Sequence, residues 1–210
     1  MNRIIENNQV NIIGEIVSGF AYSHELYGEG FYMADVKVPR LSDSFDVIPV
    51  IVSERLLDVN SNCVGLLISI TGQFRSYNRH EGRKNRLILS VFAREIEFVS
   101  QIENIHEANQ IYLDGYICKE PIYRKTPLGR EIADLLLAVN RLYGKSDYIP
   151  CICWGRNARY ASELAVGTKC NIQGRIQSRE YIKKFADDST ETRVAYEVSV
   201  SKLEVLSDEE

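Results

Sequence analysis

Apolar and polar residues alternate along much of the chain with a period of two, which is typical of strands that bury one face. The runs are short, rich in Val and Ile, and separated by Gly, Asn, Asp and Pro, which favour turns. In the second half of the chain this pattern predicts five strands, and a short helix at residues 157–164 that ends before Gly167. The strands are expected at residues 110–117, 131–140, 147–154, 169–181 and 192–206. We therefore expect an all-β protein with short helices.

The chain aligns with itself at an offset of 101 residues, so one strand-rich domain occurs twice. Residues 46–52 (DVIPVIV) match 147–153 (DYIPCIC), and after a slip of one residue 72–76 (GQFRS) match 174–178 (GRIQS). The order of three strands, a helix and two strands is that of an oligonucleotide-binding (OB) barrel. We expect two tandem OB-fold five-stranded β-barrels, at residues 1–104 (the first repeat) and 105–210 (the second repeat).

The third and fourth strands of the second repeat separate a core face from an aromatic and basic face. Ile149, Cys151 and Cys153 are expected in the core. The outward residues are Tyr148, Trp154, Arg175, Gln177, Arg179 and Tyr181. This mixture suits single-stranded nucleic acid, because bases stack on aromatic rings while arginines neutralise phosphates. The alternatives are ordinary core or interface aromatics and a solvated strand surface.

The first repeat keeps the core pattern and changes the outward positions. Its fourth strand places Gln73, Arg75, Tyr77 and Arg79 outward, and a hairpin rich in cations follows. These cations are His80, Arg83, Lys84 and Arg86. The cluster could hold a phosphate backbone with few stacked bases, and a solvated charged loop is the alternative.

The net charge of −4 argues against a protein that coats nucleic acid by bulk positive charge. Residues 107–206 nevertheless carry 15 basic and 13 acidic side chains, which allows a local basic face. The sequence contains no apolar run long enough to span a membrane and no signal peptide at its N-terminus, so we expect no membrane partner and a cytoplasmic location.

The sequence offers little that would support catalysis. Its three histidines are isolated, and it has no phosphate-binding loop, paired carboxylates or nucleophile motif, so we expect no enzyme and no cofactor. An OB-fold nuclease is the enzymatic alternative. The five cysteines include no Cys-x-x-Cys pair, and alternation points Cys151 and Cys153 inward, so we expect buried thiols rather than a metal site or disulfides.

Residues 109–206 resemble the DNA-binding domain of bacterial single-stranded DNA-binding proteins. The resemblance rests on three ordered blocks, LAVNR at 137–141, DYIPCICWG at 147–155 and GRIQSREY at 174–181. In that family four aromatic positions stack bases, and they map onto Tyr143, Tyr148, Trp154 and Tyr181, with family cations at Arg156 and Arg179. In the first repeat the four positions hold Ser42, Val47, Ser53 and Arg79. The expected DNA-binding residues are therefore Tyr143, Tyr148, Trp154, Arg156, Arg175, Arg179 and Tyr181, with Arg75, Tyr77 and Arg79 in the first repeat.

The resemblance implies binding of single-stranded DNA without sequence specificity, to protect it in replication, recombination or repair, by a cytoplasmic protein associated with the nucleoid. Family members with one OB fold per chain typically form tetramers, so a homodimer with four OB folds is expected here. Members usually end in an acidic tip closing in Pro-Phe that recruits other proteins. Residues 207–210 read SDEE, so recruitment through such a tail is not expected. A primosome-type or assembly OB protein that acts mainly through protein partners is the alternative function.

Overall fold

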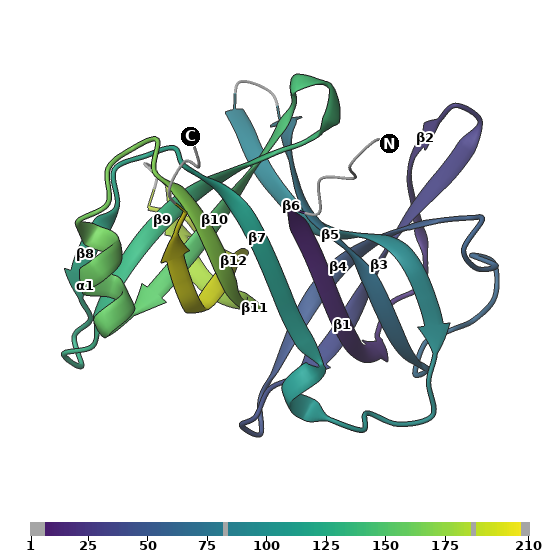
Figure 1. The fold of residues 1–210 in the computed structure, drawn as a ribbon. Coiled ribbons are helices and arrows are strands. Elements are labelled where there is room, and N and C mark those ends of the chain that lie inside the picture. The colour runs from purple at the N-terminus through teal and green to yellow at the C-terminus, as the bar shows by residue number, and fades with distance from the viewer. Residues whose placement is uncertain (1–6, 82–83, 186–187, 207–210) are drawn as a thin grey trace.

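A computed structural model describes residues 7–81, 84–185 and 188–206, and within them twelve strands form one continuous sheet (Figure 1). The strands of the first repeat are β1 (Asn8–Ile16), β2 (Ala21–Leu26), β3 (Glu29–Pro39), β4 (Phe45–Ser53), β5 (Leu67–Glu81) and β6 (Lys84–Phe98). Those of the second repeat are β7 (Asn109–Ile117), β8 (Ile122–Lys125), β9 (Glu131–Asn140), β10 (Ser146–Trp154), β11 (Lys169–Lys184) and β12 (Thr190–Val205). The helical segments are η1 (Ile105–Glu107), η2 (Leu142–Gly144) and α1 (Arg156–Ser162).

In each repeat five strands close into a barrel, which confirms the predicted fold. The first strand pairs with two others, because β1 lies against β5 along most of its length and against β3 at Ile16, opposite Val36. A short parallel contact of β4 with β6, at Val50 and Val91, completes the ring. The second repeat closes in the same order through β7, β9, β10, β12 and β11. The additional short strands β2 and β8, which pair with β3 and β9, were not predicted.

The core of each barrel is filled by the inward residues of its strands. Ile149, Cys151 and Cys153 of β10 are buried, as their alternation predicts. The predicted helix is α1, and two of its alanines, Ala158 and Ala161, are buried against the barrel. In the first repeat the equivalent residues, 54–63, form turns instead of an α-helix.

The two repeats are joined by their first strands, which lie side by side in the middle of the molecule (Figure 1). β1 and β7 pair in antiparallel fashion over five residues each, from Asn8 opposite Leu113 to Ile12 opposite Asn109. The sheet therefore runs from one barrel into the other without an edge at the junction.

Two buried aspartates tie the repeats together. Asp46 of the first repeat accepts a hydrogen bond from the backbone N–H of Ser178, at 2.7 Å, and Asp147 of the second accepts one from that of Ser76, at 2.6 Å. Each aspartate is also bound by an arginine six residues earlier in its own repeat, Arg40 or Arg141. The contacts are reciprocal, because the two serines occupy equivalent positions on β11 and β5.

Candidate nucleic-acid interface

The outward side of β10 carries two exposed aromatic side chains. Tyr148 is 44% exposed and Trp154 is 37% exposed, so both face away from the core as predicted. They lie six residues apart on one strand face, which separates them by about 20 Å. The indole Nε1 of Trp154 donates a hydrogen bond of 3.2 Å to the hydroxyl of Ser199 on β12, which fixes the ring over the neighbouring strand.

The first repeat helps to position Tyr148. The backbone N–H of Tyr148 donates a hydrogen bond of 2.7 Å to the hydroxyl of Ser76 on β5. The carboxylate of the preceding residue, Asp147, accepts a hydrogen bond from the backbone N–H of the same serine. The aromatic position in the second repeat is therefore held by a contact from the first, a link that residue patterns within one repeat do not reveal.

The outer half of β11 adds a cation and a third ring. Arg179 and Tyr181 are exposed, and Tyr181 lies opposite Arg193 of β12 in the strand register. The prediction that the whole polar side of this strand is solvent-exposed is wrong at Gln177, which is buried and donates a hydrogen bond of 2.7 Å to Glu197. We call the surface formed by Tyr148, Trp154, Arg179 and Tyr181 the stacking face.

Arg175 differs most from its expected role. Its guanidinium donates to the carboxylate of Asp46 in the first repeat, at 3.0 Å, and to the side-chain oxygen of Gln177, at 3.1 Å. Partial burial lowers the pKa of Arg175, and the charge of Asp46 opposes that shift. Arg175 thus bridges the repeats with its charge already paired, whereas the sequence suggested an open phosphate contact.

The structure describes the remaining predicted residues only in part. Arg156 is exposed at the first residue of α1, and no carboxylate among the described residues is paired with it. Tyr143 belongs to η2 and Arg79 to β5, but their side chains lie outside the described part of the molecule.

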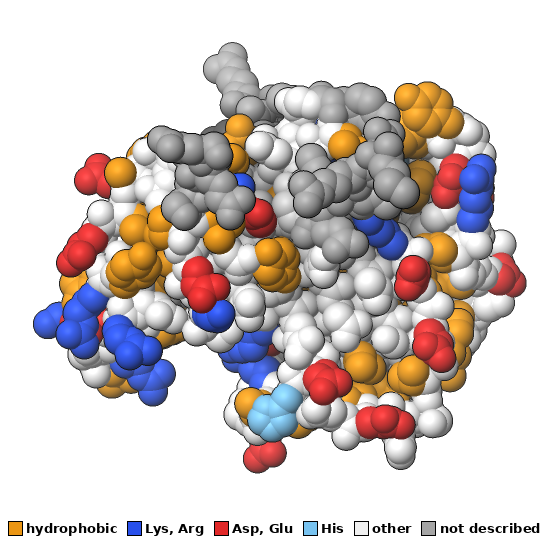
Figure 2. Space-filling view, viewed as in Figure 1, with side chains coloured by type: hydrophobic (Ala, Val, Ile, Leu, Met, Phe, Trp, Pro, Cys, Tyr) orange, Lys and Arg blue, Asp and Glu red, His pale blue; other side chains and the backbone are white. Residues whose placement is uncertain are grey.

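Two acidic residues that were not expected from the sequence pair with arginines of the second repeat. The carboxylate of Glu197 lies 3.7 Å from the guanidinium of Arg179, and that of Asp134 on β9 binds Arg124 at 2.8 and 3.2 Å. Figure 2 shows acidic, basic and apolar side chains intermixed over this view, with Lys and Arg gathered at the end of the second repeat where β8 and α1 lie. The surface therefore carries both charges, in keeping with a chain that is acidic as a whole.

In the first repeat Tyr77 is 44% exposed, whereas Arg75 is half-buried. The guanidinium of Arg75 lies 4.8 Å from the centre of the Phe92 ring and donates to the side-chain oxygen of Gln73 at 2.6 Å. Burial lowers the pKa of Arg75, and the nearby Arg141 lowers it further. Both predicted residues therefore lie on the outward side of β5, but only Tyr77 is freely accessible.

The five thiols are unpaired and mostly buried, as expected. Burial raises the pKa of Cys153 to about 12 and that of Cys170 to about 11, so both stay protonated near neutral pH. Within the described ranges no group of His, Cys, Asp and Glu side chains is arranged to hold a metal ion, and no helix is long and apolar enough to cross a membrane.

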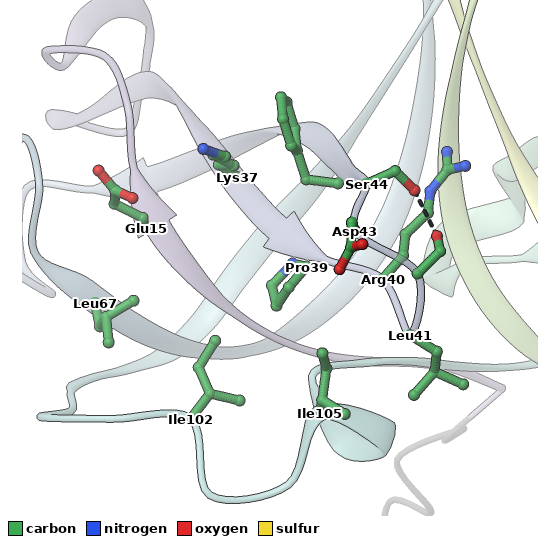
Figure 3. Close-up of a pocket in the computed structure, with 12 residues that line it drawn as sticks. Glu15, Lys37, Pro39, Arg40, Leu41, Asp43, Ser44, Leu67, Ile102 and Ile105 are labelled. Carbon is green, nitrogen blue, oxygen red and sulfur yellow. Dashed lines mark hydrogen bonds between the residues drawn. The ribbon is translucent and has the colours of Figure 1, made fainter.

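A hollow of about 450 Å³ lies in the first repeat (Figure 3). Its walls are mainly apolar and come from the loop after β3 and from Ile102 and Ile105 before β7. The one ring in its wall, Phe45, already has the ammonium group of Lys37 over it at 4.4 Å. The hollow offers no open aromatic surface, so we do not place nucleic acid there.

Comparison with known proteins connects this geometry to a family. Residues 108–206 match the model of the Single-strand binding protein family. Single-stranded DNA-binding protein 2 of Listeria innocua is 36% identical over 80 residues, which cover 35% of this chain and 50% of that protein. Single-stranded DNA-binding protein A of Bacillus subtilis is also 36% identical over 80 residues, covering 35% and 46%. The chain therefore spans about half the length of the curated relatives it matches.

The match in fold extends over both repeats. The wild-type single-stranded DNA binding protein from Thermus aquaticus superimposes with a TM-score of 0.75 at 20% identity, covering 97% of this chain and 94% of that one. A deletion mutant of that protein gives a TM-score of 0.73 at 21% identity, with 96% and 95% covered. The second repeat, residues 108–206, is therefore similar to the Single-strand binding protein family.

Proposed function

We propose that this chain binds single-stranded DNA without sequence specificity and so protects it in replication, recombination or repair. Bases stack on Tyr148, Trp154 and Tyr181, and the guanidiniums of Arg156 and Arg179 hold phosphates. Exposed rings beside arginines, on the outward side of an OB barrel, are the observation that carries this proposal. A ring that stacks a base contributes about 1–3 kcal/mol, and it does so for every base, because each base offers a π-face.

The remaining expected residues enter the proposal with different roles. Arg175 holds the two repeats together through Asp46 and contributes to binding indirectly. Tyr143 and Arg79 are assigned to DNA by their positions in the sequence. We propose that residues 1–104 and 105–210 are the two domains, that two chains form a homodimer with four OB folds, and that the protein acts in the cytoplasm on DNA of the nucleoid.

Competition among nucleic acids tests this function. A labelled thymine oligonucleotide bound to the protein is displaced by unlabelled single-stranded DNA, RNA or duplex DNA of equal length. We expect single-stranded DNA to compete best and duplex to compete poorly, because paired bases cannot reach the rings. Equal competition by duplex would contradict stacking, and no binding even at low salt would favour an assembly protein that acts through protein partners.

A further inference from the structure

Three aromatic rings form a continuous row on the outward side of the strands of the first repeat, with the middle ring, Phe31, buried. His24 of β2 stacks on Phe31 of β3, with ring centres 4.9 Å apart and planes 11° from parallel. Phe31 in turn packs beside Phe92 of β6, with the two ring centres 5.4 Å apart. The guanidinium of Arg75 lies over Phe92 and ends the row on β5. We call His24, Phe31 and Phe92 the aromatic row.

The row lies outside the barrel, on the side that corresponds to the stacking face. The neighbours of Phe92 in sequence, Val91 and Ala93, are buried in the core, so Phe92 points the opposite way. The strand registers agree, because Ile51 lies beside Phe92 as Ile152 lies beside Ser199. Phe92 therefore occupies the place that Ser199 has in the second repeat.

The first repeat has exchanged an aromatic and a serine between neighbouring strands. In the second repeat the ring is Trp154 on β10, and it reaches over Ser199 on β12. In the first repeat the position of Trp154 holds Ser53, and the ring comes from Phe92 on the strand beside it. Aligned by sequence, the first repeat lacks the aromatic residue at the position of Trp154. In the structure, however, Phe92 places a ring in the same region of the surface.

The His24 end of the row is open to a ligand. His24 is exposed while its partner Phe31 is buried beneath it, so the outer side of the imidazole is free to take a base. Tyr77, two residues beyond Arg75 on β5, is exposed on the same strand face. At the other end the half-buried guanidinium of Arg75 covers Phe92, so Tyr77 is the accessible ring there.

We infer that the aromatic row, with Arg75 and Tyr77, is a second base-stacking site, which takes bases of the same single strand that occupies the second repeat. This inference rests on the proposed function. The first repeat thereby becomes a binding domain in its own right, although its positions equivalent to the second repeat's stacking residues hold Ser42, Val47, Ser53 and Arg79.

Photochemical cross-linking separates the inference from the proposed function. The full chain is irradiated with a single-stranded oligonucleotide of about 35 nucleotides containing 5-iododeoxyuridine, long enough to span two OB folds at ~4–16 nucleotides each. We expect adducts on His24 or Tyr77 as well as on Tyr148 or Trp154. Adducts confined to the second repeat would overturn the inference and leave the proposed function standing. Adducts in neither repeat would contradict both the inference and the proposed function.

A variant measures the contribution of the site to binding. In His24→Ala/Tyr77→Ala both changes are on exposed side chains, so the barrel keeps its core. The length of poly(dT) occluded per chain should fall by the span of one OB fold, ~4–16 nucleotides. Affinity for a short oligonucleotide that fills only the second repeat should stay within twofold of wild type. Phe45→Ala, which removes an exposed ring of the first repeat outside the row, is the matched control. An unchanged occluded length in the double variant would contradict the site.

Discussion

Val10 lies directly opposite Ile111, its own counterpart in the second repeat, in the ladder that joins β1 to β7. The local twofold axis of the molecule therefore passes between these two residues and relates the aspartate contacts across the junction. Ser178 binds Asp46 as Ser76 binds Asp147, so one chain has the geometry of a symmetric pair of domains. The exception is Arg175, because it adds a second arginine to Asp46.

This junction predicts that Asp147 is important for stability. Asp147→Ala removes the buried acceptor of the Ser76 N–H and the charge partner of Arg141. Breaking a buried ion pair costs about 3–5 kcal/mol, so the free energy of unfolding in urea should fall by about 3 kcal/mol. Asp43→Ala, at an exposed acid of the same chain, should change it by less than about 0.5 kcal/mol. Equal stability of the two variants would show that the junction contributes little.

Glu197 should weaken DNA binding, because it occupies the guanidinium of Arg179. Glu197→Gln frees this arginine and keeps a side-chain oxygen that can accept from Gln177. We expect severalfold tighter DNA binding at low salt. The slope of log affinity against log salt concentration should also steepen by about one, because one more counterion is released.

The matched control for this change is Glu204→Gln, which removes an equal charge from an acid seven residues further along β12 that pairs with Lys202. It should leave affinity nearly unchanged. If both variants gained affinity to the same degree, net charge rather than the Arg179 contact would be responsible.

The buried thiols make stability fall at alkaline pH. In the unfolded chain a thiol loses its proton near its ordinary pKa of 9, whereas Cys153 in the folded protein keeps it up to a pKa of about 12 and Cys170 up to about 11. The contribution of these two thiols to the free energy of unfolding is complete below pH 9 and is lost as the pH rises toward 11 and 12.

Urea unfolding under reducing conditions at pH 8, 9.5 and 10.5 should therefore show decreasing stability. In Cys153→Ala/Cys170→Ala the decrease should be smaller, whatever the stability of this variant at pH 8. A decrease as steep as in wild type would assign the effect to other groups.

The proposed homodimer can be tested by sedimentation equilibrium. We expect the mass of two chains across micromolar concentrations, since two chains of two barrels each would supply four OB folds. A single-chain mass that does not change with concentration would contradict the dimer.

Alternation within strands predicted which residues lie on which face. Ile149 and Cys151 are in the core and Trp154 is outside it because a strand's side chains alternate whatever their neighbours are. The partners across strands and across the junction were not predictable, because register depends on residues far apart in the sequence. The contact of Arg175 with Asp46 and the exchange of Ser53 and Phe92 both depend on such registers.

The fluorescence of Trp154 during titration with a thymine oligonucleotide tests the central claim most directly, because it is the one tryptophan in the sequence and lies on the stacking face. We predict strong, saturable quenching that weakens as salt rises, and a loss of about 1–3 kcal/mol in binding when Tyr148 is replaced by Ala. Unchanged emission at oligonucleotide concentrations that shift the protein on a native gel would contradict the account, because DNA would then bind elsewhere on the molecule.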